Sequence, residues 1–532
     1  MKSSATLTSR ARVVGVATAT VAALALVPAG AAFAAPGSQS CDNRNNNTIQ
    51  KLLECVDADG AMEHLEAFQQ IADDNGGNRA AGLPGYEASV DYVVETLEAA
   101  GWNVTIDEFE YDFIGPSTLT QLTPEPAADY ETGAFSGSGD GDVTGDVVPV
   151  DINLVGDRAS DSGCEADDFA DFPAGSIALV QRGTCNFGDK AFFAEQAGAI
   201  GVIIFNQGNS PDREGLVVAD ASSLTDGTPV THGIPVVGAS FAQGVALAVD
   251  GSTAHIFVPA PEPRPQKNVI AELPGKNDDN VVMAGAHLDS VQAGPGINDN
   301  GSGSASLLEI AENLSKLKPQ NTIRLAWWGA EEDGLLGSAA YVDGLEQAER
   351  DRIALYLNFD MVASPNYIFM VYDGDESQFP APVTVPEGSI EIEDLFESYF
   401  TSVGEPYDDA EFSGRSDYEA FILNGIPAGG LFTGAEVVKT AEQEAIWGGE
   451  AGEQYDPCYH LVCDTIDNIN EHALDVNIDA IALAVLAYSY STESVNGVVG
   501  KNVPGGLSLP APAGPAGTVT EGDGGHSHGD DH

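Results

Sequence analysis

The chain has 532 residues, which is too long for one ordinary domain and predicts two to four folded units. It carries 82 acidic and 21 basic residues, so its formal net charge at pH 7 is −61. Such an acidic protein repels nucleic acid and anionic membranes, and we expect neither as a partner.

The N-terminus has the pattern of a secretory leader. Basic residues precede an apolar run from Val13 to Ala29, and the small-residue motif Ala32-Phe33-Ala34 follows it. This arrangement is typical of a signal peptide, which we predict over residues 1–34. An uncleaved membrane anchor is the alternative, but the apolar run is short for a membrane span. We therefore expect a secreted, extracellular protein with no later segment that crosses a membrane.

The six cysteines fall into three groups of two that are close in sequence. Six cysteines allow about 15 pairings, and an oxidising compartment permits disulfides. Local pairing is the simplest, and none of the spacings is the C-x-x-C of a zinc site. The pairs expected from proximity are Cys41–Cys55, Cys164–Cys185 and Cys458–Cys463.

The first part of the chain has an α/β pattern. Helical periodicity over residues 58–72 and 86–100 is followed by an alternating, strand-like run from Trp102 to Phe109. We interpret residues 41–115 as the N-terminal part of an α/β domain.

The pattern changes over residues 116–262, where short β-like runs lie among Gly, Asp and Pro. A Pro-rich stretch, Pro259 to Pro265, closes this region and is predicted to be a hinge. We interpret residues 116–262 as a β-rich domain inserted into the first one.

Strands and helices alternate again over residues 263–495. Strand-like runs near residues 281–286, 322–328 and 355–359 are each followed by a helical or polar segment. This alternation predicts an α/β fold with a mainly parallel central sheet that is covered on both faces. The tail, residues 496–532, is rich in Gly, Pro and His and is predicted to be disordered. Its His/Asp end can bind metal loosely or remain a solvated tail.

Potential metal ligands follow the predicted strands or precede a helix. In chain order they are His287, Asp299, Glu331, Glu332, Asp360 and His460. In open α/β sheets, binding sites gather at the carboxyl ends of the strands, so we expect these side chains to meet. A lone Asp-Asn-Gly is usually a turn and a lone Glu-Glu usually starts a solvated helix. The whole series, each member at a strand end or helix start, is hard to explain in that way.

The residue types suit zinc. Two imidazoles and several carboxylates are ligands that Zn²⁺ prefers. A pair of zinc ions needs a bridging carboxylate, polarises a carbonyl and lowers the pKa of a shared water, whose proton a further acidic group must take. Glu331 and Glu332 can supply one ligand and one base, in either order. Asp289 can accept the imidazole N–H of His287 and hold its tautomer.

The motifs AGAHLDS, GINDNGSG, WWGAEEDGLLGS, NFDM, FSGRSDY and PCYHLVCD resemble those of the secreted bacterial leucyl-aminopeptidase group of co-catalytic zinc peptidases. That group shares a superfamily with glutamate carboxypeptidase II and the transferrin-receptor ectodomain, and the resemblance covers roughly residues 57–492. It implies a three-layer zinc-peptidase domain with two zinc ions bridged by Asp299. His287 and Asp360 would complete one zinc site, and Glu332 and His460 the other.

The resemblance also implies roles for residues beside the ligands. Glu331 would be the general base that activates a metal-bridging water, and Tyr459 would donate a hydrogen bond to the oxyanion. Arg415 would contact the substrate or product, with a surface salt bridge as the alternative. Asp475 and Asp479 would bind a structural calcium ion, with a polar helix face as the alternative.

The runs IALVQRGTCNF and AGAIGVIIFN, within residues 177–206, resemble a protease-associated domain. Such a domain is usually a lid or a substrate-access element. It carries no ligand set of its own, so we assign it no chemistry, and a simple spacer is the alternative.

The function that the resemblance implies is a zinc aminopeptidase acting on apolar, leucine-like or aromatic N-termini of peptides and proteins. Met361 and Phe432 are candidates for the apolar pocket, with ordinary core residues as the alternative. A zinc carboxypeptidase needs several basic groups, and only Arg415 is well placed. A non-enzymatic binding protein would have lost the ligands, which are all present. We expect a monomer.

Overall fold

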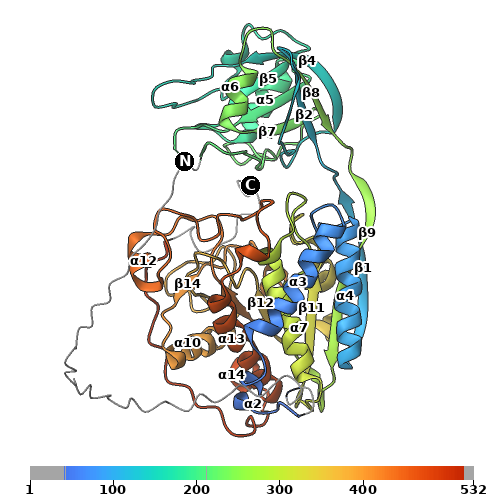
Figure 1. The fold of residues 1–532 in the computed structure, drawn as a ribbon, viewed down its shortest axis with the longest axis vertical. Helices are drawn as coiled ribbons and strands as arrows, with labels where there is room; N and C mark the ends of the chain where they lie inside the picture. The colour runs from blue at the N-terminus through green and yellow to red at the C-terminus, as the bar shows by residue number, and fades with distance from the viewer. Residues whose placement is uncertain (1–40, 42–43, 211–212, 521–532) are drawn as a thin grey trace, which may run out of the picture.

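The computed structural model describes Cys41 and residues 44–210 and 213–520, so the predicted signal peptide lies outside the described residues. The described chain forms a large body and a smaller one, joined by two long strands, β1 and β9 (Figure 1). β1 is Asn103–Phe113 and β9 is Glu262–Leu273. Because one strand leaves the large body and the other returns to it, the smaller body is inserted into the larger.

The larger sheet has eight strands within the described residues, in the order β1-β9-β11-β10-β12-β15-β13-β14. Its remaining strands are β10 (Asn277–His287), β11 (Asn321–Trp328), β12 (Ile353–Phe359), β13 (Met370–Tyr372), β14 (Asp408–Ala410) and β15 (Ala428–Phe432). The four central strands, β11, β10, β12 and β15, are parallel to one another, whereas β1, β9 and β13 pair antiparallel. The predicted parallel sheet is therefore confirmed at its centre, and the whole sheet is mixed.

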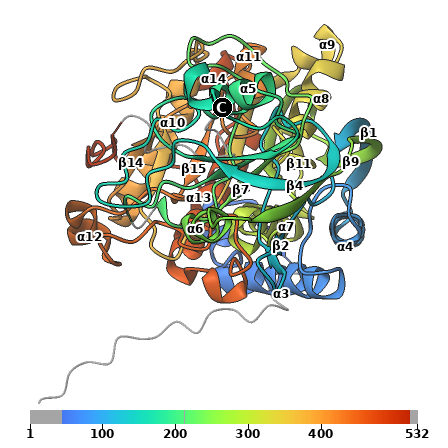
Figure 2. The ribbon, with the colours of Figure 1, turned by 90° about the horizontal axis from the view of Figure 1, so that it is seen from above.

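Helices cover both faces of this sheet, as predicted, and Figure 2 shows α8 and α11 on one side with α3 and α7 on the other. One layer contains α2 (Ile49–Leu53), α3 (Ala58–Asp74), α4 (Pro84–Ala100), α7 (Ser302–Leu314), α10 (Ser389–Val403) and α13 (Glu471–Tyr490). The other contains α8 (Leu336–Gly344) and α11 (Glu419–Leu423). Short helices α9 (Gln347–Arg350), α12 (Ala441–Trp447) and α14 (Glu493–Asn496) complete the body.

The helix α13 corrects one expectation about membranes. It is long and apolar enough to span a bilayer by length and composition, although the sequence analysis expected no such segment after the leader. Most of this helix is buried, and it packs against α2, α7 and α10. Burial in the protein core therefore explains why this helix is apolar.

The second half of the Pro-rich stretch, from Glu262 to Pro265, belongs to strand β9, which the sequence analysis did not predict. Pro263 pairs with Asp112 and Pro265 with Glu110 of β1. The two prolines are two positions apart, so their backbone nitrogens lie on the same side of the strand. That side can be the one that faces away from β1. On that side β11 pairs only with Val269 to Leu273, so the prolines interrupt no ladder. A strand side without a partner allows proline in a strand, which composition alone did not reveal.

The smaller body is built on a seven-stranded sheet of described residues, in the order β3-β2-β8-β4-β5-β6-β7. Its strands are β2 (Thr118–Thr123), β3 (Ala128–Tyr130), β4 (Gly141–Pro149), β5 (Ile177–Gln181), β6 (Gly201–Phe205), β7 (Val236–Ala239) and β8 (Thr253–Val258). Two helices, α5 (Phe187–Gln196) and α6 (Phe241–Leu247), pack on it. It has its own apolar clusters, which is consistent with the predicted β-rich inserted domain.

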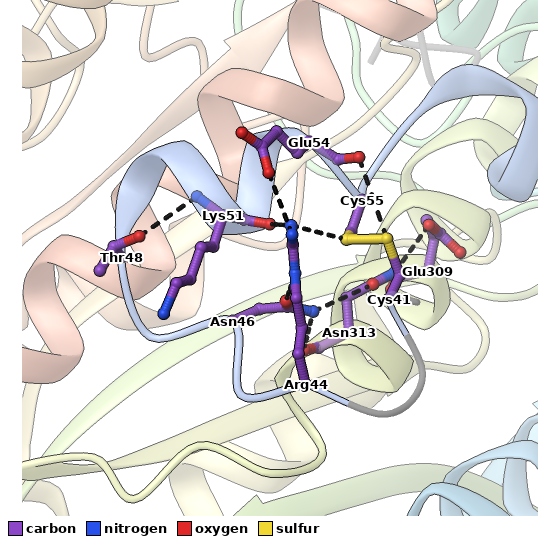
Figure 3. Close-up of a disulfide and its surroundings, with 9 residues drawn as sticks. All are labelled: Cys41, Arg44, Asn46, Thr48, Lys51, Glu54, Cys55, Glu309 and Asn313. Atoms are coloured by element: carbon purple, nitrogen blue, oxygen red, sulfur yellow. Dashed lines mark hydrogen bonds and ion pairs between the residues drawn. A yellow bond between two sulfur atoms is a disulfide. The ribbon is translucent and has the colours of Figure 1, made fainter. Parts of the chain in front are cut away.

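All three predicted disulfides are present: Cys41–Cys55, Cys164–Cys185 and Cys458–Cys463. Figure 3 shows the first, with Arg44 beside it. Arg44 donates to Asn46 Oδ1 at 2.8 Å and to Glu54 Oε2 at 3.0 Å. The side chain of Asn46 in turn donates to the main-chain carbonyl of Asn313 on α7 at 3.0 Å. This hydrogen bond connects the segment closed by the Cys41–Cys55 disulfide to the core of the larger body.

The tail differs from the predicted disorder over residues 497–520, which lie on the larger body. The Ala516 amide donates to the Tyr407 carbonyl at 2.8 Å. Asp408 accepts the amides of Gly517 at 2.9 Å and Thr518 at 2.7 Å. A buried acceptor on β14 thus pairs with the polar backbone of a Gly/Pro-rich segment. The His-rich end, within residues 521–532, lies outside the described residues.

Candidate metal centre

The central strands bring the predicted ligands together at their carboxyl ends. β11, β10 and β12 are adjacent and parallel, so the residues that follow them lie at one edge of the sheet. His287 ends β10, Glu331 and Glu332 follow β11, and Asp360 follows β12. Parallel pairing therefore gathers side chains that are far apart in sequence.

Asp299 lies between the two histidines. Its Oδ1 is 3.2 Å from His287 Nε2, and its Oδ2 is 3.3 Å from His460 Nε2. His287 Nε2 is also 3.3 Å from Asp360 Oδ1. His460 Nε2 is 3.0 Å from Glu332 Oε2. The cluster thus divides into two halves that share the carboxylate of Asp299.

These separations match those of ligands around zinc. Two atoms bound to one zinc ion at roughly 2.0–2.1 Å in tetrahedral geometry lie about 3.3 Å apart. The distances from His287 to Asp299 and Asp360 are close to that value, as is the distance from His460 to Asp299. Imidazole nitrogen and carboxylate oxygen are also suitable zinc ligands. The residues present therefore fit zinc in chemistry and in spacing.

The backbone around Asp299 is held by residues that the sequence analysis missed. Asp464 accepts the Asn298 amide at 2.9 Å and the Asp299 amide at 3.0 Å. Asp456 accepts from the Asn298 side chain at 2.7 Å. The Asp299–Asn300 peptide bond is cis. Asp464 is the last residue of PCYHLVCD, so its motif was noticed while its role was not.

The short disulfide loop carries Tyr459 and His460 between Cys458 and Cys463. The two rings stack, with centroids 3.8 Å apart. Burial raises the pKa of Tyr459 well above its usual value, and Glu436 and Asp299 raise it further. The phenol therefore stays protonated at neutral pH and can donate a hydrogen bond.

Left-handed backbone occurs at three non-glycine residues beside the cluster. The φ angles are 55° at Ala330, 47° at Met361 and 57° at His460. Such conformations are unfavourable for residues with a Cβ and persist where the surrounding structure imposes them. Ala330 precedes Glu331 and Met361 follows Asp360, so the unfavourable geometry coincides with the functional side chains.

Glu331 is fully buried, and its pKa reflects the charged groups around it. Burial raises its pKa well above the usual value, and Asp360 and Asp417 raise it further, while His287 opposes them. For His287, burial lowers the pKa, but the carboxylates of Glu331 and Asp360 outweigh it and raise the pKa. A site so rich in buried carboxylates favours cations.

Asp289 lies where a residue supporting His287 was expected, but a different atom makes the contact. His287 Nδ1 is 3.1 Å from the main-chain carbonyl of Asp289 and 3.7 Å from its Oδ1. The Asp289 carboxylate instead accepts the amides of Glu331 and Glu332, each at 3.3 Å. The strand-end turn places the carbonyl closer to the ring, so the carboxylate positions the glutamates.

Arg79 was also missed by the sequence analysis. Its side chain is fully buried and donates to the carbonyls of Leu288, Pro295 at 2.9 Å and Gly296 at 2.5 Å. These carbonyls belong to the loop between His287 and Asp299. A single guanidinium with five donors therefore fixes the loop that connects two predicted ligands.

Arg415 lies next to the cluster, because the hydroxyl of the adjacent Ser416 donates to Asp360 Oδ2 at 2.7 Å. Arg415 forms no ion pair with any described residue, which disfavours the alternative of a surface salt bridge. Met361 and Phe432 are fully buried in the main core, which agrees better with their alternative as core residues.

Asp475 and Asp479, predicted to bind calcium, lie against the start of α3. Asp475 Oδ1 accepts the Ala58 amide at 3.2 Å. Burial, together with the nearby charges of Asp475 and Asp57, raises the pKa of Asp479 to about 7. Asp57 is a third carboxylate of this group and was not predicted, because it comes from the other end of the chain.

Comparison with known proteins identifies the family. The sequence matches peptidase family M28 over residues 268–485 and the PA domain over residues 143–247. An aminopeptidase of Pseudomonas aeruginosa is 49% identical, over 84% of this chain and 83% of that protein. Leucine aminopeptidase 2 of Arthroderma otae is 39% identical, over 84% of this chain and 86% of that protein.

Among solved structures, BSAP, a zinc aminopeptidase from Bacillus subtilis, superposes with a TM-score of 0.63 and 26% identity. The match covers 81% of this chain and 94% of that one. Fold, site and relatives agree, and this chain belongs to peptidase family M28 and is a metallo-aminopeptidase that carries a PA domain.

Proposed function

We propose that this protein is a secreted aminopeptidase that uses two zinc ions to remove apolar, leucine-like or aromatic, N-terminal residues from peptides. The observation that carries the proposal is the pair of histidines on either side of Asp299, with Glu331 beside them. The leucine preference is supported by the name of the relative from Arthroderma otae. The three disulfides support an oxidising, extracellular location.

The ligand sets follow from the two halves of the cluster. His287 and Asp360 would hold one zinc ion, Glu332 and His460 the other, and Asp299 both. Zinc bound there would polarise the scissile carbonyl and lower the pKa of a nearby water, which is the chemistry such ions supply. The remaining steps belong to the protein's own side chains.

Glu331 takes the proton of the attacking water. Its Oε2 lies 3.7 Å from His287 Nε2, farther than the 3.0–3.3 Å that separate the proposed zinc ligands within each half of the cluster. Its carboxylate therefore lies beside the ligands and is not counted among them. After the attack, the same carboxyl group can return the proton to the leaving amine. Tyr459 donates its phenolic hydrogen to the developing oxyanion. Arg415 contacts the substrate on the carboxylate side of the scissile bond.

We propose the following division of the chain: catalytic residues 41–115 and 263–495, an inserted PA domain over residues 116–262, and a tail from residue 496. The register of β1 with β9 and the separate apolar clusters support the two catalytic segments and the insert. The insert carries no proposed ligand of the metal centre, so we assign it no chemical step. We propose that the protein acts as a monomer.

An aminopeptidase requires a free α-amine on its substrate, whereas a carboxypeptidase of the same fold does not. We expect leucine-p-nitroanilide to be hydrolysed faster than its glutamate and aspartate counterparts. The N-acetylated leucine substrate should give no measurable rate, because acetylation removes the free amine. A panel of aminoacyl-p-nitroanilides with and without the acetyl group measures both. Hydrolysis of the acetylated substrate at a comparable rate contradicts aminopeptidase specificity.

We propose that Asp475 and Asp479 bind a structural calcium ion together with Asp57. Carboxylate oxygens are suitable calcium ligands, and these three come from α13 and the residue before α3. A cation there would join the last long helix to the first long one.

The pH dependence of stability tests this calcium site. The folded-state pKa of Asp479, about 7, exceeds the usual value of about 3.9, so the folded chain holds this proton more tightly than the unfolded chain. Without calcium, stability should therefore fall as pH rises from about 4 to about 7. Calcium should raise the unfolding midpoint most near neutral pH. Asp479→Asn should reduce that response, while Asp467→Asn, at an exposed position, should keep it.

A further inference from the structure

A second group of carboxylates lies at the opposite edge of the large sheet, away from the metal centre. Asp373 follows β13, Glu393 lies on α10 and Asp409 lies on β14. Their side chains are 1%, 4% and 0% exposed. One carboxylate oxygen from each lies within 4.8 Å of the others. Three elements thus direct three buried acidic groups to one point.

The hydrogen bonds of this group are unevenly distributed. Asp373 accepts the amides of Ser377 at 2.9 Å and Phe379 at 2.8 Å. Glu393 Oε2 accepts the Asp375 amide at 3.0 Å. Asp409 Oδ2 accepts only a long bond, 3.4 Å, from the Ser377 hydroxyl. Asp409 Oδ1 is buried and has no hydrogen-bond donor within the described residues.

No lysine, arginine or histidine of the described chain forms an ion pair with these three carboxylates. Burial, together with the neighbouring charges of Asp375, Glu397 and Asp373, raises the pKa of Glu393 to about 9. Burial likewise raises the pKa of Asp409 to about 8, together with Asp373 and Glu397. Buried charges without a counter-ion are strongly unfavourable, so either protons or a cation must compensate them.

The local sequence favours a cation. Asp373-Gly374-Asp375-Glu376-Ser377 places oxygen-bearing side chains at alternate positions, like the first half of a calcium-binding loop. Asp375 and Ser377 are exposed, so the loop leaves the group open to solvent on one side. The possible ligand atoms are all oxygen, with no imidazole or thiolate. Such a set suits calcium better than zinc.

We propose that Asp373, Glu393 and Asp409 bind a calcium ion, with Asp375 and Ser377 on its solvent side. This site is separate from the zinc centre and from the calcium site proposed at Asp479. The ion neutralises the three carboxylates and holds β13, β14 and α10 together. It also supports the strand whose Asp408 binds the tail at Gly517 and Thr518.

Calcium content per chain tests the proposal directly. Full-length protein is equilibrated in buffer with excess zinc and calcium, freed of unbound ions by gel filtration, and analysed by mass spectrometry. Asp409→Asn should contain one calcium ion fewer than wild type, with its zinc content unchanged. Asp394→Asn, an exposed neighbour on α10, should lose none. An unchanged calcium content in Asp409→Asn overturns the proposal.

The sign of the stability change provides a second test. If calcium neutralises the cluster, Asp409→Asn should lower the unfolding midpoint in calcium buffer by several degrees. If protons neutralise it, the amide removes a buried, poorly paired carboxyl group, and the midpoint should stay or rise. Glu393→Gln repeats the comparison if Asp409→Asn does not fold. In Asp479→Asn, calcium should still raise the midpoint through the remaining site, and a protein without any calcium response contradicts the proposal.

Discussion

Replacing Glu331 with glutamine should lower kcat/KM for leucine-p-nitroanilide by roughly 10²–10⁴-fold, the usual contribution of a general base. Glutamine keeps the shape of the side chain but cannot accept the proton of the attacking water. KM should change little, because the proposed zinc ligands and Tyr459 remain. Zinc content, measured by mass spectrometry, should stay at the wild-type value. Stability should not fall, since the substitution removes a buried carboxylate that lies near Asp360 and Asp417.

The matched control is the neighbouring Glu332→Gln. Both glutamates follow β11, and both donate their backbone amides to the Asp289 carboxylate, yet only Glu332 lies close to a predicted zinc ligand, with its Oε2 3.0 Å from His460 Nε2. Glu332→Gln should therefore lower zinc content, whereas Glu331→Gln should not. Full activity of Glu331→Gln would refute the assignment of the base. Zinc loss in Glu331→Gln with retention in Glu332→Gln would mean that the two roles are reversed.

Replacing Asp299 with asparagine should have the broadest effect on the metal centre. The carboxylate is the group shared by the two halves, 3.2 Å from His287 and 3.3 Å from His460. An amide offers only one oxygen and no charge, so both zinc ions should bind more weakly. Metal-ion catalysis contributes several kcal/mol, so activity should fall on the order of 10³-fold or more. Zinc content and kcat, measured on the same preparation, check this.

Excess zinc distinguishes the two variants. Activity of Asp299→Asn should recover in part as the zinc concentration rises, because the defect is in affinity. Glu331→Gln should not recover, because its defect is in proton transfer. Asp91→Asn, an exposed change of the same kind on α4, should behave as wild type in both measurements. A fully active Asp299→Asn with normal zinc content would contradict the shared-ligand assignment.

Part of the site could be predicted from local sequence. His287, Glu331 and Glu332 lie at the ends of buried apolar runs with the pattern of strands, and parallel strands bring their ends to one edge. The roles of Asp360 and His460 were predicted mostly from the family resemblance. The disulfides were predictable for a similar reason, since each pair is close in sequence. The sequence around Glu331 and Glu332 does not indicate which of them is the zinc ligand and which is the base. That assignment came from the resemblance to a family.

Long-range contacts explain most of what the sequence analysis missed. Arg79 reaches carbonyls more than two hundred positions away, and Asp464 binds the backbone of Asn298 and Asp299. Nothing near these residues in sequence marks their partners. Likewise, nothing near Pro263 and Pro265 in sequence marks the strand β1 with which they pair.

The sequence by itself determined the order of strands and helices, the local disulfides and the ligand types, because periodicity and residue chemistry are local properties. Only the tertiary structure decided which distant groups share an environment. It joined Asp57 to Asp475 and Asp479, and it buried Asp373, Glu393 and Asp409 around one point. Charge compensation depends on distance and burial in space, and these are fixed by packing rather than by position along the chain.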